Sequence, residues 1–291
     1  MKNAKSYILC VMMSILLVFA VMGEVAVRCA KDFTSDKWCI NIINKQKVSG
    51  MVRESLERNF EEKENSTGIP ADTYMSQLDD KWISDAVNSY ITSGLDYLTG
   101  RNDEYNYSPD FTLVNKNIDK FFNDYADRNG YVKDSGFETK INSAQKNAQE
   151  IIKSNLDVVK MEKLYSEGVL KQARKYAILV NKPIVEIVSL SIIALLILLI
   201  ALVNKKKISD SFYWYGCILI IPSVIMFIPM IYLKATRYFD AFIIKQEQIY
   251  VTFTSMMYKA VDTVIVTSII LFVIGIIMTA LNAVASNNKK M

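Results

Sequence analysis

The sequence predicts an all-α, polytopic membrane protein: four transmembrane helices with a helical extracytoplasmic domain inserted between spans one and two. Three observations support this fold class. Long uncharged stretches occur at the start and in the last third of the 291-residue chain. The residues between them are as polar as those of a soluble protein. Apolar side chains in that middle part recur with the period of a helix, and no stretch reads as a convincing β-ladder.

Four windows are long and apolar enough to cross a bilayer. The hydrocarbon core of a membrane is ~30 Å thick and takes about 20 apolar residues in a helix. The windows cover residues 7–27, 184–203, 212–233 and 261–283. A helix buried in a soluble core rarely stays apolar on all sides for such a length. We therefore expect four membrane spans.

The first window shares some features with a cleaved signal peptide. Lys2 and Lys5 precede it, and Val21 and Gly23 are small residues that could stand before a cut. Its apolar run is longer than the about 7–15 residues of a typical signal-peptide core. We expect an uncleaved anchor, with cleavage as the alternative.

Basic residues near the span ends predict the orientation. With the N-terminus inside, seven basic residues lie on the inner side and four lie in the short outer loop between spans three and four. The inner residues are Lys2, Lys5, Lys205, Lys206, Lys207, Lys289 and Lys290, and the outer ones are Lys234, Arg237, Lys245 and Lys259.

This count places both termini in the cytoplasm and predicts a multi-pass protein of the cell membrane. Residues 1–30 form the N-terminal cytoplasmic tail and the first span. Residues 31–182 form the extracytoplasmic helical domain, and residues 183–291 form the other three spans and a short C-terminal cytoplasmic tail.

Within the extracytoplasmic domain, apolar residues every four positions predict a first helix over residues 48–60, followed by a turn at 66–70. Pro70 opens a short helix. A longer helix over 80–98 is closed by Gly100, and Asp110 and Ser135 are the N-caps expected for the next two. From 137 to 176 the pattern stays helical, with Pro183 before span two.

The loop over residues 238–258 is rich in Phe, Ile, Tyr and Met. Three placements are open for it. It could lie on the outer leaflet as an amphipathic helix, extend span four outward, or pack against the base of the outer domain.

The distribution of charge limits the partners. Residues 31–180 hold 21 basic and 24 acidic side chains, a net charge of −3, so the overall +4 belongs to the membrane part. An excess of positive charge there suits an anionic inner membrane surface. A domain without a basic surplus is not expected to bind nucleic acid. The expected partners are the lipid bilayer and another membrane or surface protein.

The chain has no histidine. Histidine triads, histidine metal sites and histidine proton shuttles are therefore excluded. There is also no glycine-rich phosphate loop and no GxSxG motif. Residues 127–132 resemble the middle of an EF-hand loop. In that register Tyr125 and Gly136 stand at the first and twelfth positions, where strong oxygen ligands belong, so a helix-ending turn is expected. We predict no catalytic, cofactor-binding or metal-binding residues.

Three other groups of residues are candidates for a role. Cys29 and Cys39 both face outside, ten residues apart, and form either a disulfide or two free thiols. Pro222 and Pro229 are seven residues apart in span three and predict a hinge or partner groove, although membrane helices tolerate proline without such a role.

Charged residues gather at the outer ends of the spans, whose centres are uncharged. They suggest a charged collar around an outer vestibule, or side chains that reach the interface and pair there. Uncharged centres argue against a pump, because ion coupling needs ionisable groups at depth. The collar residues are Glu24, Arg28, Lys182, Glu186, Lys259 and Asp262.

Two resemblances add to these observations. One pattern covers residues 49–100 and extends loosely over the whole chain. After the first apolar stripe it contains Thr67, Gly68, Ile69, Pro70, Trp82, Ile83, Val87, Tyr90, Ile91, Leu98, Thr99 and Gly100. It resembles uncharacterised four-span membrane proteins of Gram-positive bacteria with a helical extracytoplasmic domain. That family implies the same topology and no known activity.

The second resemblance is one of layout only. One span, a large outer domain and three further spans are similar to the order in FtsX-like and MacB-like permeases. Those families couple to a cytoplasmic ATPase through inner segments, whereas this chain has only short ones.

The function expected from the sequence is that of a non-enzymatic integral membrane protein. Its extracytoplasmic helical domain is expected to serve binding, sensing or assembly at the cell surface. The alternative is a permease-type subunit of an ABC-like transport or mechanotransmission complex.

Overall fold

The computed structural model describes residues 2–205 and 207–287. Within these residues the chain forms helices α1 to α12 and one short 3₁₀ helix, η1, and it forms no strand. The all-α prediction is therefore confirmed. Lys206, Lys289 and Lys290, used above to predict orientation, lie outside the described residues, as does the side chain of Lys2.

The chain divides into two compact units. The first, here called the span unit, contains residues 1–34, 175–242 and 256–291. The second, here called the helical unit, contains residues 35–174 and also residues 243–255. Two helices, α9 (Val169–Asn181) and α12 (Glu247–Asn287), contribute residues to both units.

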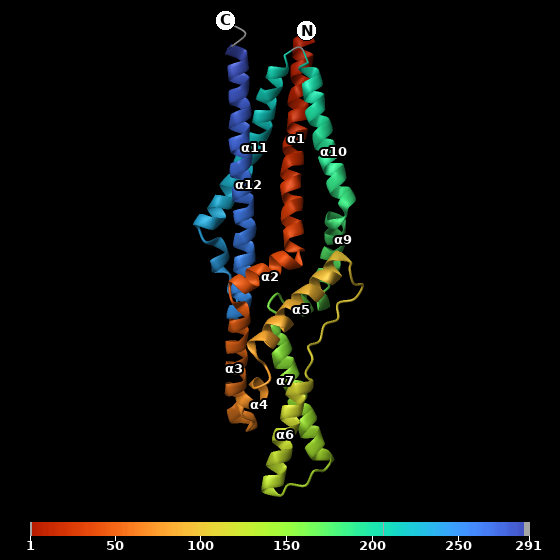
Figure 1. Cartoon of the computed structure of the whole chain (residues 1–291), viewed down its shortest axis with the longest axis vertical. Coiled ribbons are helices and arrows are strands. Elements are labelled where there is room, and N and C mark those ends of the chain that lie inside the picture. The colour runs from red at the N-terminus through yellow and green to blue at the C-terminus, as the bar shows by residue number, and fades with distance from the viewer. Residues whose placement is uncertain (1, 206, 288–291) are drawn as a thin grey trace. The chain divides into compact units, whose positions relative to one another are not determined.

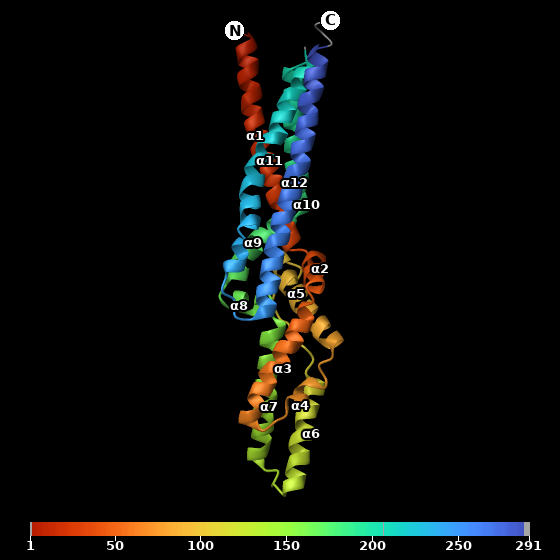
Figure 2. The same cartoon turned by 90° about the vertical axis from the view of Figure 1, so that its left-hand side faces the viewer.

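Four helices of the structure are long and apolar enough to cross a membrane, which confirms the four predicted spans. They are Ala4–Phe33 within α1 (Lys2–Phe33), α10 (Pro183–Val203), α11 (Ile208–Ala235) and Glu247–Ala285 within α12. The 3₁₀ helix η1 (Tyr238–Ala241) follows α11. Successive spans run in opposite directions, so α1 begins at the end where α10 and α11 meet (Figures 1 and 2).

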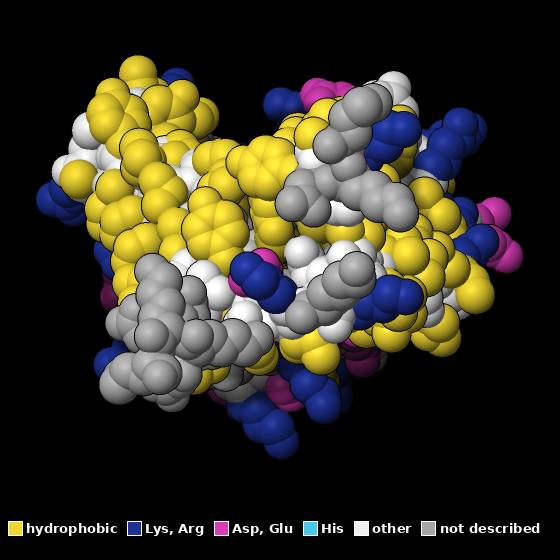
Figure 3. All heavy atoms as spheres, turned by 90° about the horizontal axis from the view of Figure 1, so that it is seen from above, with side chains coloured by type: hydrophobic (Ala, Val, Ile, Leu, Met, Phe, Trp, Pro, Cys, Tyr) yellow, Lys and Arg dark blue, Asp and Glu magenta, His cyan; other side chains and the backbone are white. Residues whose placement is uncertain are grey.

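The spans bury few of their apolar side chains against one another. A small core joins α1, α10 and α11, and contains Cys10, Met13, Leu17, Ile200 and Ile218. In α10 only 6% of the most apolar window is buried. Seen from the end where α1 begins, hydrophobic side chains cover much of the described surface (Figure 3). Such a surface requires an apolar solvent, which is typical of a multi-pass protein in a lipid bilayer.

Two glycines bring α11 and α12 into backbone contact. A Cβ atom on Gly216 would lie 2.9 Å from the Gly275 carbonyl oxygen, and one on Gly275 would lie 3.0 Å from the Gly216 carbonyl oxygen. Neither position has room for a side chain. Small residues allow such close packing between membrane helices, where the hydrophobic effect does not drive association.

The helical unit contains the remaining helices. They are α2 (Asp36–Lys45), α3 (Val48–Thr67), α4 (Ala71–Met75), α5 (Asp80–Thr99), α6 (Thr112–Asn129), α7 (Ser135–Leu156) and α8 (Met161–Ser166). The predicted stripe on α3 is its core face, since Val48, Val52, Leu56 and Phe60 are all at most 1% exposed. Gly100 ends α5 with a φ of 79°, a conformation that glycine adopts without strain.

Several predicted helix ends were wrong by one residue or more. The N-cap of α7 is Asp134, whose carboxylate accepts the Phe137 N–H at 2.9 Å, and not Ser135. The N-cap of α6 is Phe111, although the Asp110 carboxylate accepts the Thr112 N–H at 2.9 Å from one position earlier. Pro70 is the N-cap of α4 and precedes its first residue.

The helix expected over residues 137–176 is broken into α7, α8 and α9. Asp157 causes the first break, because its buried carboxylate accepts the N–H groups of Met161 at 2.7 Å and Glu162 at 2.9 Å and so begins α8. Gly168, with a φ of 76°, stands between α8 and α9. Aspartate side chains compete in this way with the helical backbone for hydrogen bonds.

We predict that the substitution Gly216→Leu disrupts the packing of α11 against α12. The new side chain would overlap the backbone of α12, and overpacking of this kind costs about 1–3 kcal/mol. The Tm of the full chain in detergent, followed by circular dichroism, should fall by several degrees. The matched control is Gly23→Leu in α1, because a Cβ atom there meets nothing within 4 Å. Equal Tm values for both variants would contradict the prediction.

Candidate functional site

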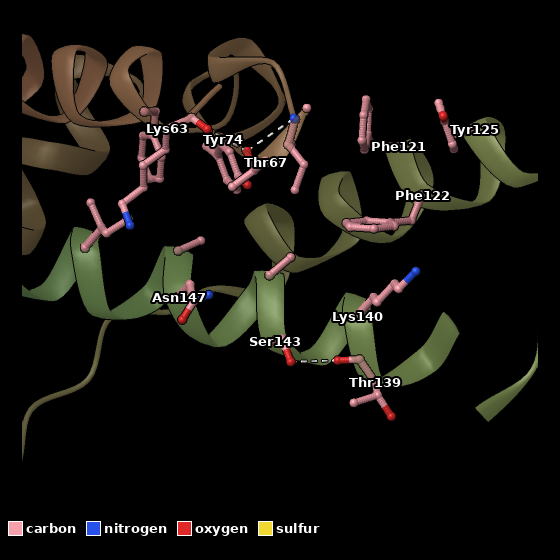
Figure 4. Close-up of a pocket in the computed structure, with 16 residues that line it drawn as sticks. Lys63, Thr67, Tyr74, Phe121, Phe122, Tyr125, Thr139, Lys140, Ser143 and Asn147 are labelled. Carbon is pink, nitrogen blue, oxygen red and sulfur yellow. Dashed lines mark hydrogen bonds between the residues drawn. The ribbon is translucent and has the colours of Figure 1, made fainter. Parts of the chain in front are cut away.

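The helical unit has a groove between the α3–α4 connection, α6 and α7 (Figure 4). We call it the aromatic groove and define it by Phe60, Lys63, Tyr74, Phe121, Phe122 and Lys140. Its volume is about 590 Å³. Pockets that bind small molecules commonly have volumes of about 300–1,000 Å³. The groove is therefore large enough to hold a ligand.

Two buried aromatic rings form one side of the aromatic groove. The rings of Phe60 on α3 and Tyr74 on α4 are stacked, with centroids 4.3 Å apart and an angle of 12° between their planes. Burial raises the pKa of the Tyr74 phenol to about 12, so this group stays neutral at ordinary pH. These two rings form an apolar, uncharged surface beside Lys63 of the same helix as Phe60.

A row of aromatic rings on α6 forms the second side. Phe121 and Phe122 are partly buried and lie edge to face at 5.7 Å, and Phe121 also lies 6.4 Å from Tyr125. Tyr125 is 50% exposed and stacks on Tyr131 at 5.8 Å. Partly exposed aromatic rings in contact with one another are typical of binding surfaces.

The third side of the aromatic groove, on α7, is polar. Thr139, Ser143 and Asn147, spaced every four residues, are among the α7 residues that line the groove. In Figure 4 the Thr139 and Ser143 hydroxyls project on the side of α7 away from the Phe122 ring. The Ser143 hydroxyl donates to the Thr139 carbonyl oxygen at 2.8 Å, and its oxygen can still accept a hydrogen bond. Lys63 and Lys140 add two cations. Aromatic, polar and cationic residues thus line one groove.

The sequence did not reveal the aromatic groove. Its sides come from residues 60–74, 121–125 and 139–151, which are far apart in the chain. Phe121, Phe122 and Tyr125 follow Val114 and Ile118 at helical spacing in one apolar stripe of the sequence. In the structure only Val114 and Ile118 are buried, at 2% and 0% exposure. An excess of aromatic residues at the end of that stripe was the one available signal.

The first turn of α12, which falls within the predicted loop over residues 238–258, makes a polar contact inside the helical unit. Gln248 is 1% exposed, and its amide nitrogen donates to the Asn155 Oδ1 atom at 3.1 Å and to the Ser55 hydroxyl oxygen at 3.3 Å. The Ser55 hydroxyl itself donates to the Asn155 Oδ1 atom at 2.7 Å. We call these three residues the polar cluster. Two of the three placements left open for the loop therefore apply together: it extends span four, and it packs in the helical domain.

Aromatic residues also gather around α5. Tyr90 and Tyr107 lie edge to face at 4.7 Å, and Tyr105 lies 5.4 Å from Tyr165. The hydroxyl groups of Tyr90 and Tyr105 are buried and have no hydrogen-bond partner among the described residues. Burial raises the pKa of both phenols, so neither is poised to exchange a proton near neutral pH.

The predicted collar residues Glu24, Arg28, Lys182 and Glu186 lie at one junction of the span unit, where α1 ends and α10 begins. Glu24 accepts a hydrogen bond from the Ser189 hydroxyl at 2.6 Å, and Glu186 forms an ion pair with Lys31. Arg28 lies 3.9 Å from Asp32 within α1, and Lys182 is the N-cap of α10.

The other two collar residues, Lys259 and Asp262, lie in α12. Asp262 forms an ion pair with Lys234 of α11 at 2.5 Å. The pairing with Lys31, Ser189 and Lys234 was not identified from the sequence, because these residues are distant in the chain from Glu186, Glu24 and Asp262. Four of the six residues, Glu24, Arg28, Glu186 and Asp262, have a side-chain partner in the described structure. The vestibule stays a prediction.

The remaining candidate residues are placed as follows. Cys29 and Cys39 carry thiols rather than a disulfide in the structure. Cys39 is 4% exposed, and burial together with the nearby Asp36 raises its pKa to about 12. Helix α11 continues through Pro222, which is buried, and Pro229, which is exposed. Whether they act as a hinge stays a prediction. Among the described residues, no group of three or more metal-ligating side chains comes together.

Comparisons with known proteins give no relative. No family model, no curated protein and no solved structure matches this chain. The two resemblances drawn from the sequence therefore stay untested.

We predict that Asn155→Leu destabilises the helical unit. It removes the acceptor shared by Ser55 and Gln248, and leaving buried polar groups unsatisfied costs about 1–3 kcal/mol. Thermal unfolding of the full chain should begin at a lower temperature. Asn142→Leu, at an exposed position of the same helix, is the matched control and should leave the Tm unchanged. An unchanged Tm in Asn155→Leu would show that the polar cluster adds no stability.

Proposed function

We propose that this chain is a non-enzymatic multi-pass protein of the cell membrane whose helical unit lies on the extracytoplasmic side and binds a ligand or partner in the aromatic groove. The observation that carries the proposal is the groove itself. It is a space of about 590 Å³ lined by aromatic residues, two lysines and polar residues of α7. Binding sites have this combination of an apolar lining and a few polar groups.

The two chain segments that make up the helical unit support its placement on one side of a membrane. Residues 35–174 connect the first and second spans, and residues 243–255 cover the end of the connection between the third and fourth spans together with the start of α12. In a chain that crosses a bilayer four times, these two connections lie on the same side. Their folding into one compact unit agrees with four complete crossings. The basic residues beside the short opposite connection, Lys205 and Lys207, favour the cytoplasm for that side.

A second function, that of a permease-type subunit in a transport or mechanotransmission complex, is favoured by one observation. Helix α12 is uninterrupted from Glu247 to Asn287, and it contributes residues to both units. A continuous helix can carry a movement along its axis. Repeated co-purification of an ATPase from native membranes would favour this second function over simple binding.

Labelling of single cysteines tests the orientation. In a variant without its four native cysteines, we expect Asn142→Cys on α7 to react with a membrane-impermeant maleimide in intact cells. Lys207→Cys, between α10 and α11, should react only after permeabilisation. Both positions are exposed in the structure, so accessibility within the protein does not separate them. The opposite pattern would place the helical unit in the cytoplasm.

Photo-crosslinking in cells tests binding. We expect p-benzoylphenylalanine in place of Tyr125 to form a covalent adduct with the ligand or partner on irradiation, because this side chain lines the aromatic groove. The matched control is the same replacement at Leu113, which is on the same helix and is similarly exposed, 56% against 50%. Absence of any adduct specific to Tyr125, detected by mass spectrometry, would count against the proposed function.

A further inference from the structure

We propose that the aromatic groove binds an acidic peptide segment. An aromatic or aliphatic side chain of that segment lies against the rings of α6, and its carboxylates pair with Lys63 and Lys140. The inference rests on the proposed function, since it names the ligand of the same site.

The charges in the groove are the first reason to expect an acidic ligand. Lys63 and Lys140 are the charged side chains among the described residues that line it, and no carboxylate is among them. Neither ammonium group has an ion-pair partner in the described part of the chain, whereas the nearby Lys133 pairs with Asp127 at 2.7 Å. Residues 31–180 carry a net charge of −3, so this groove is a cationic site in an acidic domain. A ligand with negative charge complements it.

The separation of the two lysines is the reason to expect an extended ligand rather than a compact anion. Figure 4 shows Lys63 and Lys140 toward opposite ends of the groove. A compact anion such as phosphate needs donors that converge on one point. Two separated ammonium groups with an apolar surface between them suit an extended chain that carries carboxylates at intervals.

The polar residues of α7 are the reason to expect a peptide backbone in the ligand. The Asn147 amide, which has no hydrogen bond to other described residues, can both donate and accept. Groups of this kind satisfy a peptide backbone, which a purely apolar groove would leave without partners.

The apolar surface continues beyond the groove. A second hollow shares Phe122, Tyr125 and Lys140 with it and extends to Tyr131 and Val132, which are 61% and 79% exposed. Asp134 also lines this hollow, but its carboxylate caps α7 by accepting the Phe137 N–H. Side chains of a bound segment can therefore be buried on both sides of Tyr125.

Fluorescence anisotropy with the full-length protein in detergent tests the inference. The probe is a labelled peptide that alternates aspartate with phenylalanine. We expect it to bind, and we expect a peptide that alternates lysine with phenylalanine, and one that alternates aspartate with serine, to bind at least about tenfold more weakly, which corresponds to about 1.4 kcal/mol. Added salt should weaken the binding, because exposed ion pairs are screened.

The double variant Lys63→Gln/Lys140→Gln should lose about tenfold or more in affinity for the aspartate–phenylalanine peptide. The matched control is Lys146→Gln, an exposed lysine of α7 that does not line the groove. Equal circular dichroism spectra would show that all variants are folded. Equal affinity for the aspartate and lysine peptides, or no effect of the double variant, would overturn the inference.

The outcome is distinct from that of the crosslinking experiment. If Tyr125 crosslinks to a ligand in cells and the acidic peptide does not bind, the ligand class is wrong and the proposed function stands. If inorganic phosphate displaces the peptide at low concentration, the groove recognises a compact anion and the inference is likewise overturned.

Discussion

The structure depends on apolar side chains that the protein itself does not bury. Span α10 has only 6% of its most apolar window buried, and the other spans have at most 22%. Burial of these side chains therefore requires lipid, and lipid in turn requires every backbone group within it to be bonded inside a helix. Each crossing also reverses the side on which the chain emerges. An even number of crossings brings the first and third connections to the same side, and these are the two segments that build the helical unit.

Local patterns were enough to predict the helices but not their ends. The centres of the four spans could be predicted, because about 20 uncharged residues in a row have few alternatives to a membrane helix. The ends of the spans could not be predicted, because a helix continues past its apolar residues wherever its backbone groups remain hydrogen-bonded. Thus α12 begins at Glu247, well before the predicted start at residue 261. The cap of α7 was misplaced by one residue, since Asp134 and Ser135 are both good N-caps and only the geometry selects between them.

The candidate site could be predicted only in part. Charged residues at the outer ends of the spans were recognised from composition, but their partners depend on which helices become neighbours. Lys234 pairs with Asp262 across 28 residues, and Lys31 with Glu186 across 155. The aromatic groove was missed because no single helix contains it. Phe60, Phe121 and Ser143 each follow an ordinary helical pattern, and only the tertiary fold places them around one space.

The polar cluster has a consequence for the order in which the chain is made. Asn155 precedes its partner Gln248 by 93 residues, and spans two and three are synthesised between them. At about 5–20 residues per second, roughly 5–20 s pass before the partner emerges from the ribosome. During that interval the Ser55 and Asn155 side chains lack the Gln248 amide, which donates hydrogen bonds to them in the finished protein. The helical unit is therefore completed only after span three has been synthesised.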